Sequence, residues 1–260
     1  MPRANRHRIP GQVWHISHRC HHRQFLLKFA KDRRAWVGWL YEARKRFVLC
    51  VLNYQVTSNH AHVLVLDRGD DEIASSMQLV AGRTGQDFNR RKARGGAFWE
   101  DRYHATGVDT DEHLARCLVY IDLNMVRAGV VEHPQQWGEA GYHEIQRPRR
   151  SYRIIDRAAL SNLLAVSEDR LASVHEEWVR SKLACRDRAR EPEWSDAIAV
   201  GRRAFVEQVQ RDLGARGRYR RIEEANGTAI LREAESLYTP HFAAEMPGLS
   251  TEKALLESRR

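Results

Sequence analysis

Hydrophobic and polar positions alternate along the first 70 residues as expected for strands separated by a helix. Residues 13–18 alternate with a period of two after the Pro10-Gly11 break, which predicts a half-buried strand. The apolar run over 47–52 predicts a strand buried on both faces. A second strand is predicted over 60–66. Because only the polar Thr57-Ser58-Asn59 separates these two strands, we expect them to form a hairpin.

Helical periodicity fills the intervals between the strands. Apolar residues recur at helical spacing from Trp36 to Phe47, and Asp32 is placed to cap this helix. A second helix is predicted to begin near Asp70 and to break around Gly82 or Gly85, because glycine weakens a helix interior.

A third helix follows residues 98–104, which fit either a short strand or a loop. Thr110 is placed to cap this helix, its apolar stripe runs from Leu114 to Met125, and Gly129 ends it. The alternation of strands and helices around a hairpin predicts an α+β fold, in which helices pack on one face of an antiparallel sheet.

The chain changes character near residue 150. Pro134 and the run Arg147-Pro148-Arg149-Arg150 indicate a domain edge, so we expect one domain over 1–150 and a helical C-terminal extension over 151–260. Helical patterns cover 157–182 and 196–213 of the extension. Bracing the first domain, covering its site and docking a nucleic acid are three roles among which the sequence does not choose.

The charge of the chain is concentrated in the first domain. The whole chain has a formal net charge of +9, and residues 1–150 contain 24 basic and 16 acidic side chains, against 19 and 18 in the remainder. Eleven of the 13 histidines also lie in the first 150 residues. A polyanionic partner is therefore expected to bind there.

Two classes of protein do not fit the composition. The four cysteines, at positions 20, 50, 117 and 185, form no close pair, so neither a zinc knuckle nor a disulfide framework is predicted. No apolar run approaches the roughly 20 residues that span a bilayer, and the basic start of the chain lacks the apolar core of a secretory signal. We expect a cytoplasmic protein with reduced thiols.

The segment His60-Ala61-His62 is the first candidate for chemistry. Residues two apart on a strand point to the same face, so both imidazoles project together and can grip one metal ion. Solvated or packed histidines are the alternative, and they are the more common reason for this pattern in a strand.

The second candidate lies on the third predicted helix. Tyr120 and Asn124 are four residues apart, and Arg127 continues the same stripe beside the apolar one. The alternative is an amphipathic tyrosine at the rim of the core.

Together these segments resemble the single-tyrosine HUH transposases, and most closely the branch called REP-associated tyrosine transposases. The resemblance covers about residues 8–150. It departs from the family pattern where Thr57-Ser58 replaces Met-Pro and where Met125 replaces a proline. The segments that carry it are Trp14–Arg19, Ser58–Val65, Phe98–His104 and Tyr120–Val131.

The resemblance implies a ferredoxin-like HUH domain that cuts single-stranded DNA beside a REP-like hairpin and rejoins it through a 5′-phosphotyrosine. Tyr120 would be the nucleophile, His60 and His62 the ligands of Mg²⁺ or Mn²⁺, and Asn124 a third ligand or the support of one. The family is expected to act as a monomer, with a dimer left open, and to associate with the nucleoid when bound to DNA.

Two other activities remain open at this point. A catalytically silent, domesticated hairpin-binding protein would keep the fold and the basic surface without forming a covalent bond. An RNA-processing or unrelated metallohydrolase activity would need neither Tyr120 nor a hairpin.

Basic and aromatic residues near these motifs are candidate DNA contacts. A solvated surface is the alternative for the cations, and core packing is the alternative for the tryptophan. Tyr103, which lacks an amide at helical spacing, is expected to contact DNA or the core rather than to act as the nucleophile. The candidate DNA contacts are Arg19, Arg23, Arg90, Arg91, Lys92, Arg94, Trp99, Arg102 and Arg127.

Overall fold

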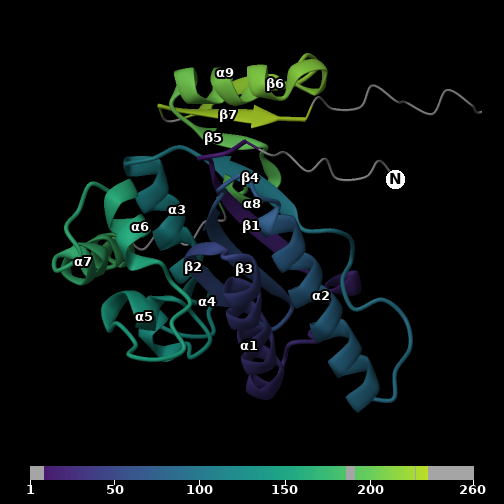
Figure 1. Cartoon of the computed structure of the whole chain (residues 1–260). Coiled ribbons are helices and arrows are strands. Elements are labelled where there is room, and N and C mark those ends of the chain that lie inside the picture. The colour runs from purple at the N-terminus through teal and green to yellow at the C-terminus, as the bar shows by residue number, and fades with distance from the viewer. Residues whose placement is uncertain (1–8, 186–190, 226, 234–260) are drawn as a thin grey trace, which may run out of the picture.

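The computed structural model describes residues 9–185, 191–225 and 227–233, and it shows a mixed α+β fold around one sheet (Figure 1). The first part of the chain has the order βαββαβ, and its four strands lie side by side as β2-β3-β1-β4, all antiparallel. This is the ferredoxin-like arrangement. Its elements are β1 (Val13–Arg19), α1 (Ala30–Phe47), β2 (Cys50–Val56), β3 (His60–Leu66), α2 (Glu72–Arg91) and β4 (His104–Val108).

The predicted hairpin is confirmed. Strands β2 and β3 pair antiparallel, with Tyr54 opposite Val63 and Gln55 opposite His62. All seven residues of β2 are buried, which agrees with the prediction of a strand covered on both faces.

The predicted α+β fold is confirmed, and helices cover both faces of this sheet rather than the one face that was expected. Helices α1 and α2 pack together on one face (Figure 1). On the other face, the Asn53 side chain of β2 donates to the Asp122 carboxylate of α3 (Glu112–Asp122), 3.1 Å away. Polar side chains on that face of the strands therefore meet a helix rather than water, which the alternating pattern alone did not reveal.

Helix α2 runs through both glycines at which the sequence predicted a break. Phe98 packs directly against it, because a Cβ added to Gly85 would lie 3.2 Å from the Phe98 Cβ. The glycine thus marks a close approach between the helix and the following loop. Packing of this kind offsets the intrinsic cost of a helical glycine, about 1 kcal/mol.

The predicted caps are also corrected. Asp32 lies inside the first turn of α1 and forms an ion pair with Arg91, and the residue before the helix, Phe29, makes no side-chain cap. Thr110 does not cap α3, whose N-cap position is Asp111, also without a side-chain hydrogen bond. The Asp32 side chain thus makes a tertiary contact, and tertiary packing stabilises both helices instead.

The third predicted helix is divided in two at Leu123. Helix α3 ends at Asp122, and a single further turn, α4 (Asn124–Arg127), continues the chain to Gly129, which takes a left-handed φ of +68° as expected of a helix-ending glycine.

The extension is helical only in part. The strands β5 (Ala199–Gly201), β7 (Thr228–Arg232) and β6 (Arg221–Ala225) continue the sheet in the order β4-β5-β7-β6, and β5 is parallel to β4. The helix predicted over 196–213 is therefore wrong at residues 199–201, because a short apolar run fits a strand as well as a buried helix. One helix precedes the extension, α5 (Tyr142–Gln146). The helices of the extension itself are α6 (Arg157–Leu163), α7 (Leu171–Ala184), α8 (Glu193–Asp196) and α9 (Arg203–Asp212).

The state of the cysteines and the length of the helices concern the disulfide-rich and membrane-spanning classes of protein, which the composition did not fit. All four cysteines are free thiols, and three of them are buried. Among the described helices, none is both long enough and apolar enough to cross a membrane. The parts of the two predicted domains that fall on residues 1–8, 186–190, 226 and 234–260 lie outside the described residues.

Candidate active site

The two histidines of β3 project to the same face of the sheet, as their spacing predicts. Their ring centroids are 4.7 Å apart, with the planes nearly perpendicular. His60 is half-buried at the start of the strand, and His62 is buried.

The turn before β3 determines which nitrogen of His60 carries the proton. The Asn59 amide nitrogen donates to the Arg23 carbonyl, so its oxygen faces His60 Nδ1 at 2.7 Å and can only accept. The proton therefore sits on Nδ1, and Nε2 is left with the lone pair that a metal ion would take. Thr57 also contacts Nδ1 at 2.9 Å and accepts from the His60 backbone N–H.

A chain of hydrogen bonds fixes His62 in the same way. The Trp194 backbone carbonyl lies 2.6 Å from His15 Nδ1, and His15 Nε2 lies 2.9 Å from His62 Nδ1. Burial lowers the pKa of His15 to about 4, so this ring is neutral at pH 7. A carbonyl can only accept, so His15 donates through Nδ1, His62 donates through Nδ1, and His62 Nε2 is unprotonated.

Asn124 and Tyr120 meet the histidines from the opposite helix. Asn124 Nδ2 lies 3.1 Å from His62 Nε2, and the Tyr120 ring stands edge-on, with its centroid 6.1 Å from that of His62. The Arg127 guanidinium lies 4.1 Å from the Tyr120 ring centroid and donates to the Tyr120 carbonyl at 2.7 Å. The structure thus brings together all four residues that the two motifs singled out.

The donor set fits a divalent cation. Two imidazole Nε2 atoms and the Asn124 amide oxygen, once the amide is turned so that its oxygen faces His62, provide two nitrogen ligands and one oxygen ligand. Within the described residues no group of three His, Cys, Asp or Glu side chains could hold a metal ion. The Asn124 amide oxygen would be the third protein ligand, and a carbonyl oxygen is a ligand type that suits Mn²⁺ and Mg²⁺.

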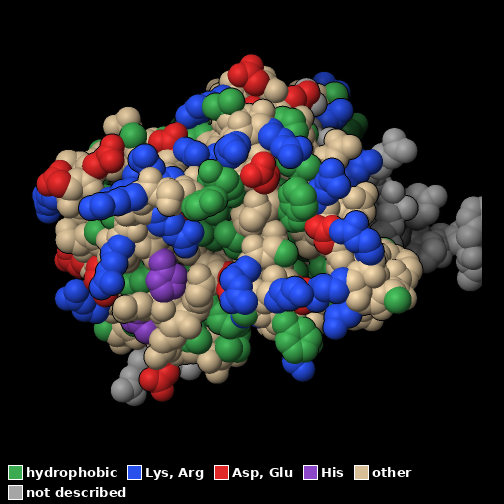
Figure 2. Space-filling view, turned by 60° about the horizontal axis from the view of Figure 1, so that its bottom comes forward, with side chains coloured by type: hydrophobic (Ala, Val, Ile, Leu, Met, Phe, Trp, Pro, Cys, Tyr) green, Lys and Arg blue, Asp and Glu red, His purple; other side chains and the backbone are tan. Residues whose placement is uncertain are grey.

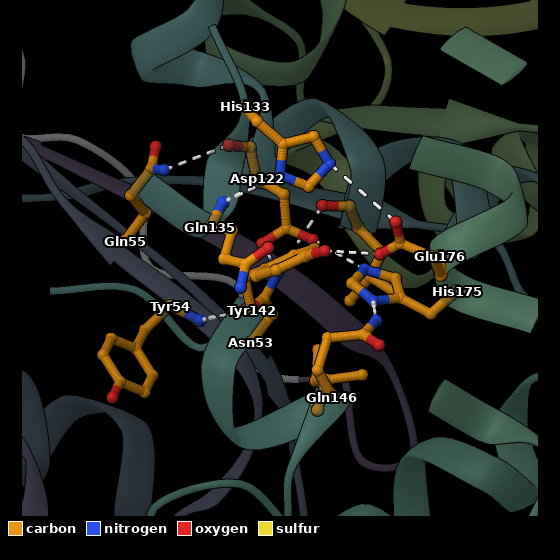
Figure 3. Close-up of polar contacts among 12 residues, drawn as sticks. Asn53, Tyr54, Gln55, Asp122, His133, Gln135, Tyr142, Gln146, His175 and Glu176 are labelled. Atoms are coloured by element: carbon orange, nitrogen blue, oxygen red, sulfur yellow. Dashed lines mark hydrogen bonds and ion pairs between the residues drawn. The ribbon is translucent and has the colours of Figure 1, made fainter. Parts of the chain in front are cut away.

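Asp122, between Tyr120 and Asn124, anchors this helix in a buried polar network (Figure 3). Its carboxylate accepts from Asn53 of β2 and lies 2.7 Å from His175 Nε2 of α7, and both members of the Asp122–His175 pair have fully buried side chains. His175 Nδ1 in turn lies 2.8 Å from the Gln146 amide nitrogen. The extension therefore holds the helix end from which the tyrosine and the asparagine project.

Cationic side chains are frequent on one face of the molecule. Figure 2 shows this face, which includes the lower ends of α1 and α2 in Figure 1, and Lys and Arg side chains outnumber Asp and Glu on it. Of the predicted DNA contacts, Arg23, Arg90, Lys92 and Arg102 are exposed, and Arg19 is half-buried opposite His60.

Three other predicted contacts have partners within the chain, as does the exposed Arg90, which pairs with Asp87 at 2.7 Å. Arg91 forms an ion pair with the buried Asp32, and Arg94 donates to the Ala97 carbonyl. Trp99 stacks on His18 at a centroid distance of 4.0 Å and donates to the Ala81 carbonyl, which favours the packing role that was its alternative.

Sequence reasoning did not identify His15 and Trp194 as part of this site. Alternation places His15 on one of the two faces of β1, but only the pairing of β1 with β3 shows that this is the face of His62. Trp194 contributes only its backbone carbonyl. Every residue has this group, so the residue type does not indicate its role.

Comparison with known proteins agrees with the site. Residues 11–124 match the family described as "Transposase IS200 like", and this segment contains both histidines, Tyr120 and Asn124. This part of the chain is thus similar to the IS200-like transposases, as the sequence resemblance predicted.

One solved structure is similar to this chain. It is described as "Structure of the REP associates tyrosine transposase bound to a REP hairpin", with 18% sequence identity and a TM-score of 0.47 over 56% of this chain and 85% of that chain. No curated protein matches the chain.

Proposed function

We propose that the protein is a metal-dependent transposase that cuts single-stranded DNA beside a REP-like hairpin and rejoins it through a covalent bond to Tyr120. The observation that carries this proposal is the convergence of His60, His62, Tyr120 and Asn124 within the segment that matches the transposase family. Each residue type has a distinct part in such a reaction.

Tyr120 would supply the nucleophile. Its phenolic oxygen forms a bond to the scissile phosphorus, and the bond from phosphorus to the 3′ oxygen breaks. The phenol gives its proton to solvent and the leaving 3′ oxygen takes one up, so the step needs no oxidant and no nucleotide cofactor. The phosphoester is conserved, and attack by a 3′-hydroxyl on the phosphotyrosine reverses the reaction.

His60, His62 and Asn124 would hold Mg²⁺ or Mn²⁺, which polarises the scissile phosphate and stabilises its developing charge. Neighbouring residues determine the protonation state of both histidines in the absence of an ion. Asn59 keeps the proton of His60 on Nδ1, and His15 does the same for His62, so both Nε2 atoms are left as bases.

Arg127 would serve the tyrosine directly. Its guanidinium lies against the Tyr120 ring, and one of its nitrogens holds the Tyr120 carbonyl. A fixed positive charge at this distance would attract the scissile phosphate to the Tyr120 side chain.

The exposed cations of Figure 2 fit a DNA backbone. Arg23, Arg90, Lys92 and Arg102 are exposed, and phosphate contacts made by such residues bind DNA without reading its sequence. We place the reaction in the cytoplasm, on the nucleoid.

A monomer is favoured by the edges of the sheet. Strand β4 pairs with β5 and is therefore unavailable to a second copy. The outer strand β6 carries Glu223 and Glu224 in ion pairs with Arg232 and Arg203. Charged side chains on an edge strand oppose pairing with another sheet.

One observation favours the second candidate, a hairpin-binding protein that no longer cuts. Tyr120 is only 5% exposed, and the Asn124 amide nitrogen, rather than its oxygen, faces His62 Nε2. Both groups have to move slightly for catalysis, whereas binding to the basic surface requires no such change.

A denaturing gel separates these two candidates. Labelled single-stranded hairpins from the DNA flanking the gene are incubated with Mn²⁺ or Mg²⁺ and either wild type or Tyr120→Phe. A denaturant-resistant complex with wild type alone supports the transposase. Salt-sensitive binding without any such complex supports the hairpin-binding protein.

A further inference from the structure

A pocket of about 580 Å³ lies between α3 and α7, and the candidate nucleophile forms part of its wall. Val119 of α3 and Leu123, which follows this helix, line one side, and Leu164 and Trp178 line it from the extension. Tyr120 and Arg127 complete the lining on the side of the site. Pockets of this volume with mostly apolar walls and a few polar groups are typical of sites for small organic ligands.

One polar group in the pocket wall lacks a hydrogen-bond partner. Arg127 donates through Nη2 to the Tyr120 carbonyl, but its Nη1 is buried and makes no hydrogen bond to the described residues. A buried guanidinium nitrogen without an acceptor is costly, and a phosphate oxygen or a carbonyl of a base would satisfy it.

The other charged groups at the pocket are mixed. Lys182 lines it and is paired with Glu191 at 2.8 Å, and Arg116 donates to Thr228 at 2.9 Å. Asp111 and Glu112 lie in the wall at the start of α3. Because the acidic and basic groups balance, the pocket does not suit an extended run of phosphates, and it suits a largely neutral ring attached to one phosphate.

We propose that this pocket receives the nucleotide on the 3′ side of the cut, the one whose 5′ phosphate becomes bonded to Tyr120. Its base would lie between the apolar side chains of α3 and Trp178, and its phosphate would meet Arg127 Nη1. The proposal rests on the proposed function, since it assumes that Tyr120 is the nucleophile.

This assignment gives the extension a specific part in the reaction. Helix α7 supplies one wall of the pocket and, through His175, also holds Asp122 beside Tyr120. Covering the site, one of the three roles that the sequence left open, is therefore combined with holding the nucleotide. Base–aromatic contacts tolerate any base, so the pocket would increase the rate of cutting without fixing the sequence.

The test compares two versions of one hairpin substrate. The cut position is mapped first, and the nucleotide 3′ of it is then replaced by an abasic residue. With wild type, we expect the abasic version to form the adduct about 5- to 150-fold more slowly, the range for loss of one stacked base. Equal rates for the two versions would overturn the proposal while leaving the phosphotyrosine mechanism intact.

A variant that fills the pocket tests whether the dependence of the rate on this base arises in the pocket. Ala115 lines the pocket and is not one of the four site residues, and Ala115→Phe is expected to give equal, slow rates with both versions of the substrate. Ala172→Phe is the matched control, because Ala172 is an equally half-buried α7 residue outside the pocket lining, and it should behave as wild type. An undiminished dependence on the base in Ala115→Phe would contradict the assignment to this pocket.

A binding measurement separates this proposal from the proposed function. Tyr120→Phe is mixed with the hairpin carrying 2-aminopurine 3′ of the mapped position, or at each flanking position in turn if no adduct forms. Stacking in the pocket should quench the fluorescence at one position, and adding Ala115→Phe should abolish the quenching. Quenching without an adduct means that the pocket binds a base and the covalent mechanism fails. An adduct with wild type, without quenching in Tyr120→Phe, would overturn the pocket assignment alone. If neither the adduct nor the quenching is seen, the pocket assignment and the covalent mechanism are both overturned.

Discussion

His15 Nε2 lies 2.9 Å from His62 Nδ1, and this buried hydrogen bond connects a residue outside the His-x-His motif to the motif itself. The far side of His15 is held by the Trp194 carbonyl at 2.6 Å, so the extension reaches the candidate metal site through one side chain. The consequence is that His62 presents an unprotonated Nε2 whether or not an ion is bound.

Replacement of His15 should therefore weaken metal binding without affecting the DNA surface. We expect His15→Phe to lower the affinity for Mn²⁺ about 10- to 100-fold, the usual effect of removing a residue that orients a metal ligand. Titration of Mn²⁺ followed by electron paramagnetic resonance measures this change. His15→Gln should recover part of the loss, because its amide can accept from His62 and donate to Trp194. Unchanged affinity in His15→Phe would show that this hydrogen bond does not orient His62.

The buried pair of Asp122 and His175 should dominate the stability of the contact between α3 and α7. Asp122→Ala leaves His175 and Asn53 without their shared acceptor and is expected to lower the free energy of unfolding by about 3–5 kcal/mol. Urea unfolding measures this loss. In a double-mutant cycle of Asp122→Asn and His175→Gln, we expect a coupling free energy of about 1–3 kcal/mol. Additive effects would argue against a direct pair.

Neighbouring cations at the end of α2 should have different effects. Lys92 is exposed, so Lys92→Ala should weaken hairpin binding for all sequences alike and reduce the salt slope of log K by about 1. Arg91 neutralises the buried Asp32, so Arg91→Ala should lower stability by about 3 kcal/mol. Binding assayed at several salt concentrations, together with urea unfolding, distinguishes the two. An unchanged salt slope in Lys92→Ala would remove this end of α2 from the DNA surface.

His18 predicts a loss of stability in mild acid. Burial lowers the pKa of His18 to about 4, and its Nδ1 has no hydrogen-bond partner among the described residues, so a proton there would be a buried, unsatisfied donor. The unfolded chain binds this proton near pH 6.5. The free energy of unfolding should therefore fall by about 2 kcal/mol from this residue as the pH drops from 7.5 to 5.

The matched variant is His18→Phe, which keeps a ring against Trp99 and removes the titrating group. The slope of the free energy of unfolding against pH between 6.5 and 4.5 should be smaller in this variant by up to one proton. Parallel curves for the two proteins would mean that His18 is not buried in the neutral form.

Much of the first domain could be predicted from periodicity alone. The hairpin of β2 and β3, the shared face of His60 and His62, and the helix carrying Tyr120 all follow from spacings of two and about 3.6 residues. The predicted helix differs only in its division at Leu123, which places Asn124 in α4. These signals are local, and the chemistry of both motifs lies within single elements.

The features that the sequence predicted wrongly depend on contacts between elements that are distant in the sequence. Gly85 suggests a helix break until the packing of Phe98 against it is known, and residues 199–201 form a strand only because β4 offers an edge. The tautomer of His62 depends on a carbonyl at Trp194, which no residue type signals. Periodicity gives the elements, and the long-range pairs give the site its protonation state and its pocket.

The most direct test of the central claim identifies the residue that carries the DNA. After incubation with hairpin substrate and Mn²⁺, the adduct is digested with trypsin and nuclease and analysed by mass spectrometry. The tryptic peptide 117–127 contains Tyr120 as its single tyrosine, and Tyr103 falls in the separate peptide 103–116. The account predicts a nucleotide mass on the peptide 117–127 in the presence of metal and none after chelation. A nucleotide on the peptide 103–116, or an adduct that forms without metal, would contradict it.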